Sequence, residues 1–294
     1  MSLDFKLLNC KIRVKKPEKT EILDLRMKDM RTRKSMRYPQ IDPVLIHLGP
    51  LQLRWYGLMY IFGFIIAYVV VMDVCRRRKL PMTKMEVEDF ITYCILGLVL
   101  GARIGYCLIY NPSYYLSNPL KMFAVWEGGM SFHGGLIGLI ITGAIFSANR
   151  KKGFLMLADF GALGATPGLF FGRIGNFINA ELYGRVTKVP WGMVFPNGGP
   201  LPRHPSQIYE ALSEGALLFI ILYLVSRKVN IHGILFGVFL ACYGIIRFVL
   251  EFFREPDPQL GLIIGPFSMG QVLCMIMVAA GLILITWRLK SRQV

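Results

Sequence analysis

Seven apolar stretches, separated by short polar segments, dominate the sequence from about residue 51 onwards. Their approximate bounds are 51–74, 90–110, 130–148, 155–171, 207–225, 234–253 and 268–287. The chain is 54% apolar and has a mean hydropathy of +0.48, whereas soluble domains are about 45–50% apolar. Stretches of this length and composition are typical of membrane spans. We therefore expect an all-α polytopic membrane protein with about seven transmembrane helices.

Basic residues gather in short clusters between the apolar stretches, and the formal net charge is +16. The clusters cover residues 76–79, 150–152, 227–228 and 288–292. Cytoplasmic loops of membrane proteins are enriched in Lys and Arg, and such clusters meet anionic lipid head groups. We therefore expect the N-terminus outside, the C-terminus cytoplasmic, and no nucleic acid as a partner. A polar region at about 173–206 then faces outwards.

The first 37 residues are polar and strongly basic and contain no long apolar run. Exporting so much positive charge beside the first span opposes the positive-inside bias. We expect residues 1–37 to be disordered or foreign to the native product, with residues 1–35 dispensable and Met36 as the natural start. The alternatives are a basic arm lying on anionic head groups and an inverted N-terminus. Residues 38–294 are expected to form a single transmembrane domain.

A dense polar cluster follows the fourth apolar stretch. It contains Arg173, Asn176, Asn179, Glu181 and Arg185. An arginine at a membrane boundary is costly unless it has a partner or a function, or its head group extends into the interface. So many polar groups at one boundary favour a site over a single extended arginine.

Glycines recur at steps of three and four residues along the fourth apolar stretch. They are Gly161, Gly164, Gly168, Gly172 and Gly175. Small-residue stripes let helix backbones approach closely in lipid. We expect this side of the fourth helix to pack against a neighbour and to fix the backbone that carries Arg173.

Three charged residues share one face of the sixth span. Arg247, Glu251 and Arg254 follow one another at i, i+4 and i+7. They can form an internal ion pair with an additional interfacial arginine. Two guanidinium groups and one carboxylate also leave a positive surplus, and a phospholipid phosphate is the anion at hand. The planar guanidinium donates two parallel hydrogen bonds to phosphate oxygens.

Other candidates lie nearer the spans. His133 opens the third span on the same outer side as Arg173, so it is either a structural hydrogen bonder or a proton acceptor, because the unperturbed pKa of histidine as a residue type is about 6.5. Arg103 lies deep in the second span and is a structural, gating or catalytic residue. Tyr56 is an interfacial aromatic residue or a donor to a substrate oxygen. Ser206 and Glu210 can cap the fifth span.

Several motifs of other enzyme classes are missing. The sequence has no P-loop, no glycine-rich dinucleotide turn, no HExxH and no GxSxG. The six cysteines show neither CxxC nor metal-site spacing, and we interpret them as small core residues. We expect no metal and no cofactor. An enzyme of this kind must act by positioning and charge, with a nucleophile that the substrate supplies.

Five motifs, in their order, resemble the bacterial prolipoprotein diacylglyceryl transferases. They are WYGLMY (55–60), SFHGG (131–135), GRIGNFINAELYGR (172–185), RHPSQIYE (203–210) and RFVLEFFR (247–254). The resemblance extends from about Tyr38 to the C-terminus. The chain departs from the family in its longer basic stretch before Tyr38 and in its short region between Arg185 and Arg203.

The resemblance implies that residues 38–294 are a catalytic domain. Its reaction transfers the diacylglyceryl group of phosphatidylglycerol to the lipobox cysteine thiol of a prolipoprotein and releases glycerol phosphate. The implied partners are phosphatidylglycerol, prolipoprotein signal peptides with a lipobox cysteine, and membrane lipids. The implied location is the bacterial plasma (inner) membrane, with the active site towards the outer leaflet.

The family's functional residues map onto this chain at the matching motifs. The implied catalytic residues are His133, Arg173, Arg247 and Tyr56, and the implied phosphatidylglycerol-binding residues are Arg173, Asn176, Glu181, Gly184, Arg247, Glu251 and Arg254. The chemistry fits, because a thiol with a pKa near ~8.5 must lose its proton before it attacks carbon. His133 can accept that proton, and Arg173 and Arg247 can hold the leaving phosphate.

Two other function classes can use the same arginines. One is a transporter or channel for an anionic solute, lined by Arg103, Arg173 and Arg247. The other is a lipid-binding scaffold without catalysis. The absence of two halves with matching interrupted helices argues against a secondary transporter.

Overall fold

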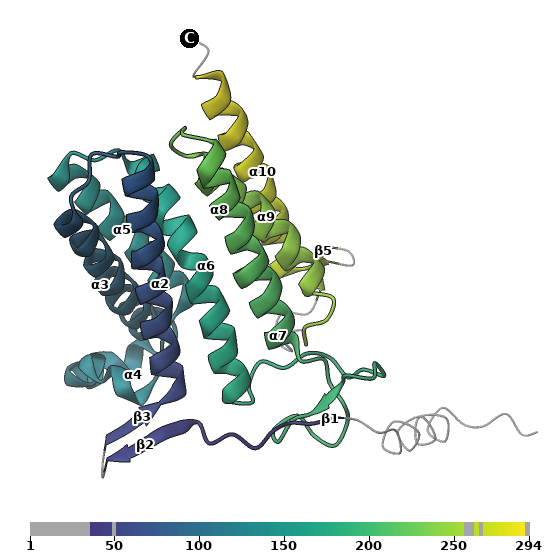
Figure 1. Cartoon of the computed structure of the whole chain (residues 1–294). Helices are drawn as coiled ribbons and strands as arrows, with labels where there is room; N and C mark the ends of the chain where they lie inside the picture. Colours follow the sequence, from purple (N-terminus) through teal and green to yellow (C-terminus); the bar gives the residue numbers. More distant parts are fainter. Residues whose placement is uncertain (1–35, 49–50, 256–261, 265–266, 292–294) are drawn as a thin grey trace, which may run out of the picture.

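The molecule is an antiparallel bundle whose connections alternate between its two ends (Figure 1). The structure is a computed structural model that describes residues 36–48, 51–255, 262–264 and 267–291. The predictions for residues 1–35 lie outside this part of the chain. The long helices of the described residues are α2 (Trp55–Arg77), α3 (Lys84–Ile109), α5 (Phe132–Arg150), α6 (Phe154–Ile178), the continuous run α7 (Ser206–Glu210), η3 (Ala211–Leu217) and α8 (Leu218–Lys228), then α9 (Ile234–Leu250) and α10 (Met269–Lys290).

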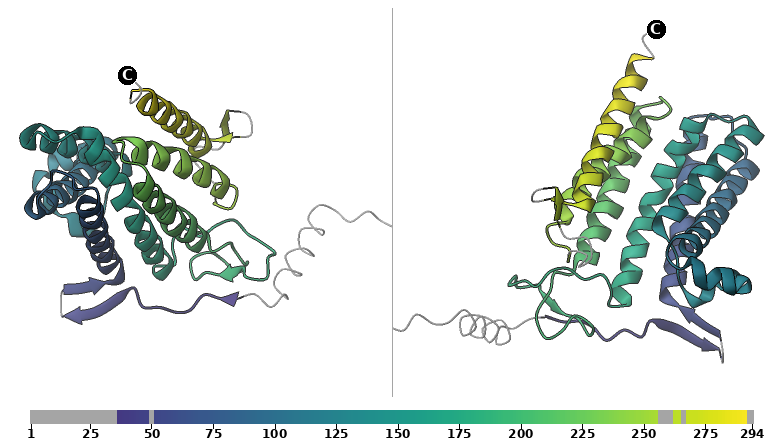
Figure 2. Two further views of the ribbon diagram at one scale, coloured as in Figure 1. Left: turned by 45° about the horizontal axis from the view of Figure 1, so that its top comes forward. Right: turned by 180° about the vertical axis from the view of Figure 1, so that it is seen from behind.

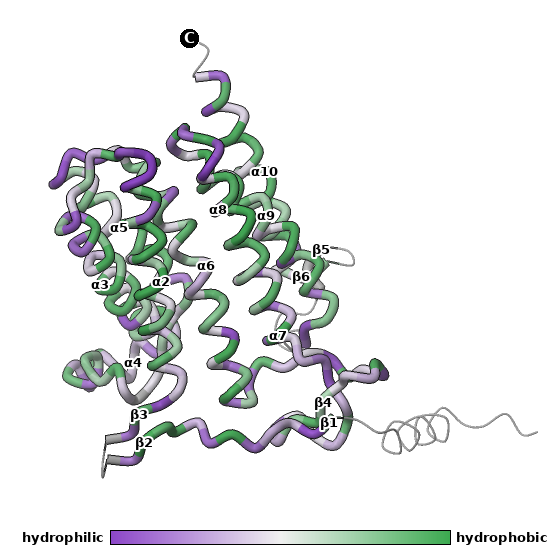
Figure 3. Tube along the Cα trace, viewed as in Figure 1, coloured by the Kyte–Doolittle hydropathy of each residue, from purple (hydrophilic) through white to green (hydrophobic). Residues whose placement is uncertain are grey.

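Six of these helices are long and apolar enough to cross a membrane, with Ser206–Lys228 counted as one. The remaining helix, α9, has 17 residues, which is the lower limit for a span. Hydrophobic residues fill the middle of the helices, and hydrophilic residues gather at both ends of the bundle (Figure 3). The predicted helical, multi-pass architecture is therefore confirmed.

The four basic clusters lie at one end of the bundle. The helices α2, α5, α8 and α10 all end there, at the top of Figure 1 and of the right-hand view of Figure 2. We call this the basic end. The polar segments that join α6 to α7 and follow α9 lie at the opposite end, which we call the site end. The alternation of loops that the charge pattern predicted is thus present.

The largest apolar core cluster lies in the half of the bundle nearer the basic end. It joins the second half of α2, the start of α3, the end of α5, the first half of α6 and the start of α8; its bulkiest fully buried members are Phe146, Phe160, Leu163, Leu218 and Leu222. Burying such side chains contributes roughly 1.5–3 kcal/mol each. A smaller apolar cluster around Tyr38, Ala180 and Phe195 lies at the site end, beside the polar groups there.

Three predicted helix limits are wrong. The first span was expected from residue 51, but Leu51–Arg54 forms strand β3, which pairs with β2 (Val44–Leu48), and α2 begins only at Trp55. The second span was expected from residue 90, but α3 begins at Lys84. The fourth span was expected to stop at residue 171, but α6 continues to Ile178. The helix can continue because partners elsewhere in the fold hold the polar side chains of its last turns.

Short strand pairs close the site end. Besides β2–β3, strand β1 (Met36–Arg37) pairs in parallel with β4 (Met193–Val194), and β5 (Leu262–Ile264) pairs with β6 (Phe267–Ser268). The buried Tyr38 follows β1, and its hydroxyl donates to the carbonyls of Phe177 (2.7 Å) and Ile178 (2.8 Å). These carbonyls belong to the last turn of α6, where the i+4 donors of the helix run out, and the Phe177 carbonyl also accepts from Ala180 N (3.0 Å). The first described residues therefore hold the end of the helix that carries the polar cluster.

The glycine stripe of α6 packs against α2, as predicted, at three of its positions. A Cβ at Gly164 would lie 3.2 Å from Ala67, and one at Gly175 would lie 2.7 Å from the Tyr56 ring, while Gly168 lies against Gly63. At Gly168 the contact is made from the other side, since a Cβ at Gly63 would lie 3.1 Å from the Gly168 Cα, whereas a Cβ at Gly161, Gly168 or Gly172 would meet nothing within 4 Å. A still closer glycine contact joins α3 to α5. Both contacts follow the small-residue rule for helices in lipid.

Candidate active site

The last turns of α6 carry the first half of a polar network. Arg173 donates to Asn176 Oδ1 (3.4 Å), and Asn176 Nδ2 donates to Glu181 Oε1 (2.8 Å). The chain then turns sharply, because Ala180 and Leu182 have φ values of 53° and 56°. This left-handed backbone ends the helix and folds Glu181 back onto Asn176.

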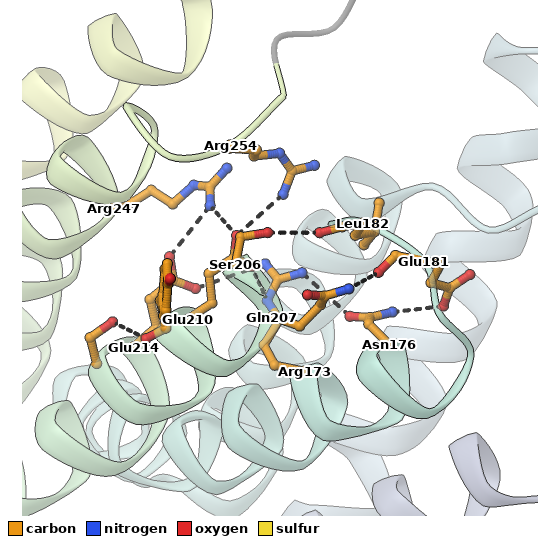
Figure 4. A network of polar contacts seen from close by, with 12 residues as sticks. Arg173, Asn176, Glu181, Leu182, Ser206, Gln207, Glu210, Glu214, Arg247 and Arg254 are labelled. Atoms are coloured by element: carbon orange, nitrogen blue, oxygen red, sulfur yellow. Dashed lines mark hydrogen bonds and ion pairs between the residues drawn. The ribbon is translucent and has the colours of Figure 1, made fainter. Parts of the chain in front are cut away.

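Two buried glutamates form the centre of the network (Figure 4). Glu210 ends α7 and Glu214 lies in the π-helical turn η3; π-helical turns are frequent at functional sites. Arg173 Nε lies 2.6 Å from Glu210 Oε2, and Arg173 Nη2 lies 3.8 Å from Glu214 Oε2. The two carboxylates thus face the guanidinium group of Arg173, the first residue of the polar cluster found in the sequence.

Helix α9 completes the network from the other side. Arg247 Nη1 lies 3.3 Å from Glu210 Oε1 and 3.5 Å from Glu214 Oε1. Its Nη2 lies 2.9 Å from Glu251 Oε2, which confirms the expected i, i+4 pair. Arg254, just beyond α9, lies 3.7 Å from Glu210 Oε1. Glu210 therefore contacts three guanidinium groups.

The predicted positive surplus on the sixth span is wrong for the network as a whole. Arg173, Arg247 and Arg254 face three carboxylates, those of Glu210, Glu214 and Glu251. The fifth span supplies two of the three, because the fold brings α7 and η3 between α6 and α9. An anion that binds here must compete with these carboxylates for the guanidinium donors.

The segment after α6 is tied to α7 and to the end of α9. Gly184 N donates to the His204 carbonyl (2.8 Å), and a Cβ at Gly184 would lie 2.3 Å from the Phe253 carbonyl oxygen, so the position requires glycine. Arg185 Nε donates to the Arg254 carbonyl (2.7 Å). Burial lowers the pKa of His204, which keeps its ring neutral at pH 7.

The polar start of α7 reaches back to the same segment. Gln207 Nε2 donates to the Glu181 carbonyl (2.6 Å), and Ser206 Oγ donates to the Leu182 carbonyl (3.0 Å). Ser206 and Glu210 therefore do not cap the fifth span, as one interpretation of the sequence held. They join α7 to the neighbouring polar segment and to the arginines.

A family model described as prolipoprotein diacylglyceryl transferase matches residues 43–287 of this chain. The chain belongs to the prolipoprotein diacylglyceryl transferase family. Its expected assignment to a membrane-embedded transferase family is thus confirmed. The transporter or channel has no support.

Relatives named phosphatidylglycerol–prolipoprotein diacylglyceryl transferase align with nearly the whole transmembrane region. The protein from Geobacter sulfurreducens is 58% identical over 247 residues, which are 84% of this chain and 95% of the relative. The one from Oleidesulfovibrio alaskensis is 50% identical over 259 residues, or 88% of this chain and 97% of the relative. A Coxiella burnetii protein is 51% identical over 257 residues, or 87% and 98%.

Most of the residues that the family resemblance pointed to come together in this network. Arg173, Asn176, Glu181, Arg247, Glu251 and Arg254 are joined by hydrogen bonds and ion pairs, and Gly184 forms a backbone bridge with Arg254. Tyr56 lies beside them, because its ring packs on Gly175 and its hydroxyl lies 3.3 Å from the Tyr60 hydroxyl. These positions of the family motifs therefore form one spatial unit.

His133 lies outside the network. It is exposed at the start of α5, its ring contacts that of Phe132, and within the described part of the chain no hydrogen bond or ion pair joins it to the arginines. Its end of α5 is the site end, as the topology predicted.

Arg103 is a structural residue. It is 3% exposed and donates to the carbonyls of Lys121 (2.6 Å), Met122 (2.9 Å), Gly128 and Gly129 (3.1 Å), in the connection that contains α4 (Pro112–Ser117), η1 (Pro119–Phe123) and η2 (Val125–Glu127). Its donors are engaged in holding this connection. It is therefore unsuited to line a path for anions together with Arg173 and Arg247.

Sequence reasoning missed Glu214 and Gln207. Both are fully buried and both belong to the centre of the site. The available signal was a second acidic residue one turn after Glu210 inside an apolar span, since ionisable residues within spans are costly and mark functional positions.

Proposed function

We propose that this chain transfers the diacylglyceryl group of phosphatidylglycerol to the lipobox cysteine thiol of prolipoproteins, the first step of lipoprotein maturation. The observation that carries the proposal is the convergence of Arg173, Arg247 and Arg254 at one end of a membrane-spanning bundle. Phosphate is the lipid group that planar guanidinium forks bind best. Family membership supplies the reaction that such a site would perform.

The reaction breaks a carbon–oxygen bond at the phosphate. The cysteine thiol loses its proton. Its sulfur then attacks the carbon of the diacylated glycerol that is bonded to the phosphate oxygen. A thioether forms, and the electron pair of the broken bond stays on the oxygen of the departing glycerol phosphate. Charge therefore develops on the phosphate in the transition state, and positive groups placed there lower the barrier.

Arg173 and Arg247 are the residues assigned to this charge. Their side chains are 19% and 16% exposed, so part of each side chain remains accessible, whereas the carboxylates beside them are buried. In a site of low dielectric such donors are worth more than in water. Arg254 contacts the Glu210 carboxylate, which Arg173 and Arg247 also contact, and is assigned to lipid binding.

Asn176, Glu181 and Gly184 are assigned to holding the lipid head group. Asn176 and Glu181 are already oriented by their hydrogen bond, and Gly184 keeps the following segment close to Arg254. Tyr56 can donate its phenol to a substrate oxygen, since its hydroxyl is partnered by the Tyr60 hydroxyl alone among the described residues. Glu251 lies one turn after Arg247 on the same helix face and holds its guanidinium group by an ion pair.

His133 is assigned to accept the proton of the cysteine thiol. Its separation from the arginines suits a reaction with two substrates, in which the lipid phosphate and the peptide thiol approach from different sides. The attacking sulfur must lie opposite the leaving phosphate for displacement at carbon. His133 is exposed at the site end, and histidine is the residue type most often used as a general base.

The proposed location is the bacterial plasma (inner) membrane, with the site towards the outer leaflet. The four basic clusters at one end support a cytoplasmic basic end. The site end, the N-terminal strand β1 and the segment 183–205 then face outwards, where a secreted precursor presents its signal peptide. The C-terminus is cytoplasmic in this arrangement.

One assay tests the function. Purified protein is incubated with phosphatidylglycerol and a synthetic peptide that contains a lipobox cysteine, and the peptide is analysed by mass spectrometry. We expect a mass increase equal to one diacylglyceryl group on the cysteine. A peptide in which serine replaces that cysteine is the control. An unmodified cysteine peptide in the presence of bound lipid would favour the non-catalytic lipid-binding scaffold.

A further inference from the structure

Glu214 is a buried acid between Arg173 and Arg247 in the middle of the arginine network. Its side chain is 0% exposed, and neither carboxylate oxygen accepts a hydrogen bond from a described residue. The guanidinium nitrogens that face it lie 3.5 Å (Arg247) and 3.8 Å (Arg173) away. A buried ionised carboxylate without hydrogen bonds is unfavourable. The fold therefore buries the Glu214 carboxylate without giving either oxygen a hydrogen-bond donor.

The other titratable groups around Glu214 are better partnered or carry a fixed charge. Glu210, on the same run of helix, accepts a hydrogen bond from Arg247 at Oε1 (3.3 Å), while its Oε2 has only the ion pair with Arg173 (2.6 Å). Glu251 lies 2.9 Å from Arg247 and accepts a hydrogen bond from Ser268 (3.1 Å). Arginine does not lose its proton in proteins. The remaining titratable neighbours are Tyr243 of α9 and Cys274 of α10, both of which are neutral when protonated. Glu214 is thus the acid that most readily changes its charge.

The charge balance of the network changes when a lipid phosphate arrives. The three guanidinium groups and the three carboxylates in ion pairs with them are neutral together when all are ionised. A phosphodiester adds one negative charge, and the leaving phosphate monoester adds more. Uncompensated negative charge is strongly opposed in a site of low dielectric. One proton on Glu214 restores neutrality. It also removes the negative charge of the carboxylate that lies 3.5 Å from Arg247 and 3.8 Å from Arg173, which leaves these guanidinium groups free to bind the phosphate.

We propose that Glu214 takes up one proton when the phosphate of phosphatidylglycerol binds to Arg173 and Arg247. The inference rests on the proposed function, which places the lipid phosphate at these arginines. Glu214 is a positioning residue, since it acts on the phosphate through the two guanidinium groups. By reciprocity of linked equilibria, binding then tightens as the pH falls, by up to about tenfold per pH unit.

Calorimetry of lipid binding measures the proton directly. The full-length protein in detergent micelles is titrated with phosphatidylglycerol at pH 8 in two buffers that differ in ionisation enthalpy. We expect about one proton taken up per lipid bound by the wild type. Glu214→Gln should bind the lipid without proton uptake. Glu88→Gln, an exposed acid in the half of α3 nearer the basic end, is the control and should behave as the wild type.

The outcomes separate the inference from the function. Lipid binding without proton uptake by the wild type, or unchanged uptake by Glu214→Gln, would overturn the inference and leave the transferase intact. Diacylglycerol, which lacks the phosphate, should give no uptake, and uptake with this lipid also overturns the inference. Failure of the wild type to bind phosphatidylglycerol would overturn both proposals. If Glu214→Gln does not fold, an infrared difference spectrum of the wild type still decides, because lipid binding must then produce the carbonyl band of a protonated carboxylic acid.

Discussion

Arg173 of α6 and Arg247 of α9 hold the same two carboxylates. Each guanidinium group faces Glu210 and Glu214, with Arg173 on the Oε2 atoms and Arg247 on the Oε1 atoms. The two arginines come from different helices and do not need to contact each other for their spacing to be fixed. The two glutamates of the fifth span therefore fix the spacing between the arginines of the fourth and sixth spans.

Replacing either arginine by lysine should strongly reduce transfer. Arg173→Lys and Arg247→Lys keep the charge and lose the planar fork. Losing one donor that stabilises a developing charge costs roughly 2.7–4 kcal/mol, or about 100- to 1,000-fold in turnover. The peptide-modification assay measures it. Arg227→Lys, an exposed change at the basic end, should be without effect. Near-normal rates in both site variants would refute the phosphate clamp.

Replacing His133 by glutamine should lower turnover and leave lipid binding unchanged, because the imidazole serves the thiol and lies outside the arginine network. The loss should shrink as the pH approaches the pKa of the thiol, near ~8.5, where the thiolate forms without a base. Rates from pH 6 to 9 and a separate lipid-binding measurement check this. A loss independent of pH would mean that His133 has a structural role.

Gly184→Ala should inactivate the enzyme and destabilise it. The new Cβ would lie 2.3 Å from the Phe253 carbonyl oxygen and 2.9 Å from the His204 Cβ, so the segment must move away from Arg254. Overpacking of this kind costs roughly 1–3 kcal/mol. Gly161→Ala meets nothing within 4 Å and is the matched control. Thermal unfolding and the transfer assay measure both variants, and equal behaviour of the two would argue against the close contact.

Tyr38→Phe should destabilise the site end. The change removes a buried hydroxyl that donates to the Phe177 and Ile178 carbonyls, and a hydrogen bond of this type contributes about 1 kcal/mol. Burial raises the pKa of Tyr38, so the donor keeps its proton at neutral pH. Tyr110→Phe, at an exposed tyrosine, is the control for thermal unfolding. The same melting temperature for both variants would contradict the capping role.

Cysteine labelling should report the orientation in the membrane. Asn197→Cys lies at an exposed position of the site end, and Lys228→Cys lies at an exposed position of the basic end. An impermeant thiol reagent added to intact cells should label position 197 above the parent chain and should label position 228 only after permeabilisation. The reverse pattern would place the site on the cytoplasmic face, against the charge bias.

The sequence by itself determined the helical class and the family. It also determined that the four basic clusters lie at the same end of the bundle. Apolar length and local charge decide these properties, and both are visible in one dimension. The i, i+4 pair of Arg247 and Glu251 was also predictable, because helix geometry alone brings such residues together.

Only the tertiary structure decided the electrostatics of the site. Arg173 and Arg247 could be named from their motifs, but their neutralisation by Glu210 and Glu214 depends on how α7 and η3 pack between α6 and α9. The same packing lets α6 continue past Phe171, because a polar side chain can extend a membrane helix when distant segments supply its partners. The carbonyls that engage Arg103 likewise come from a loop that the sequence could not position. Contacts between segments far apart in the chain fix all three, and no local pattern of residues contains them.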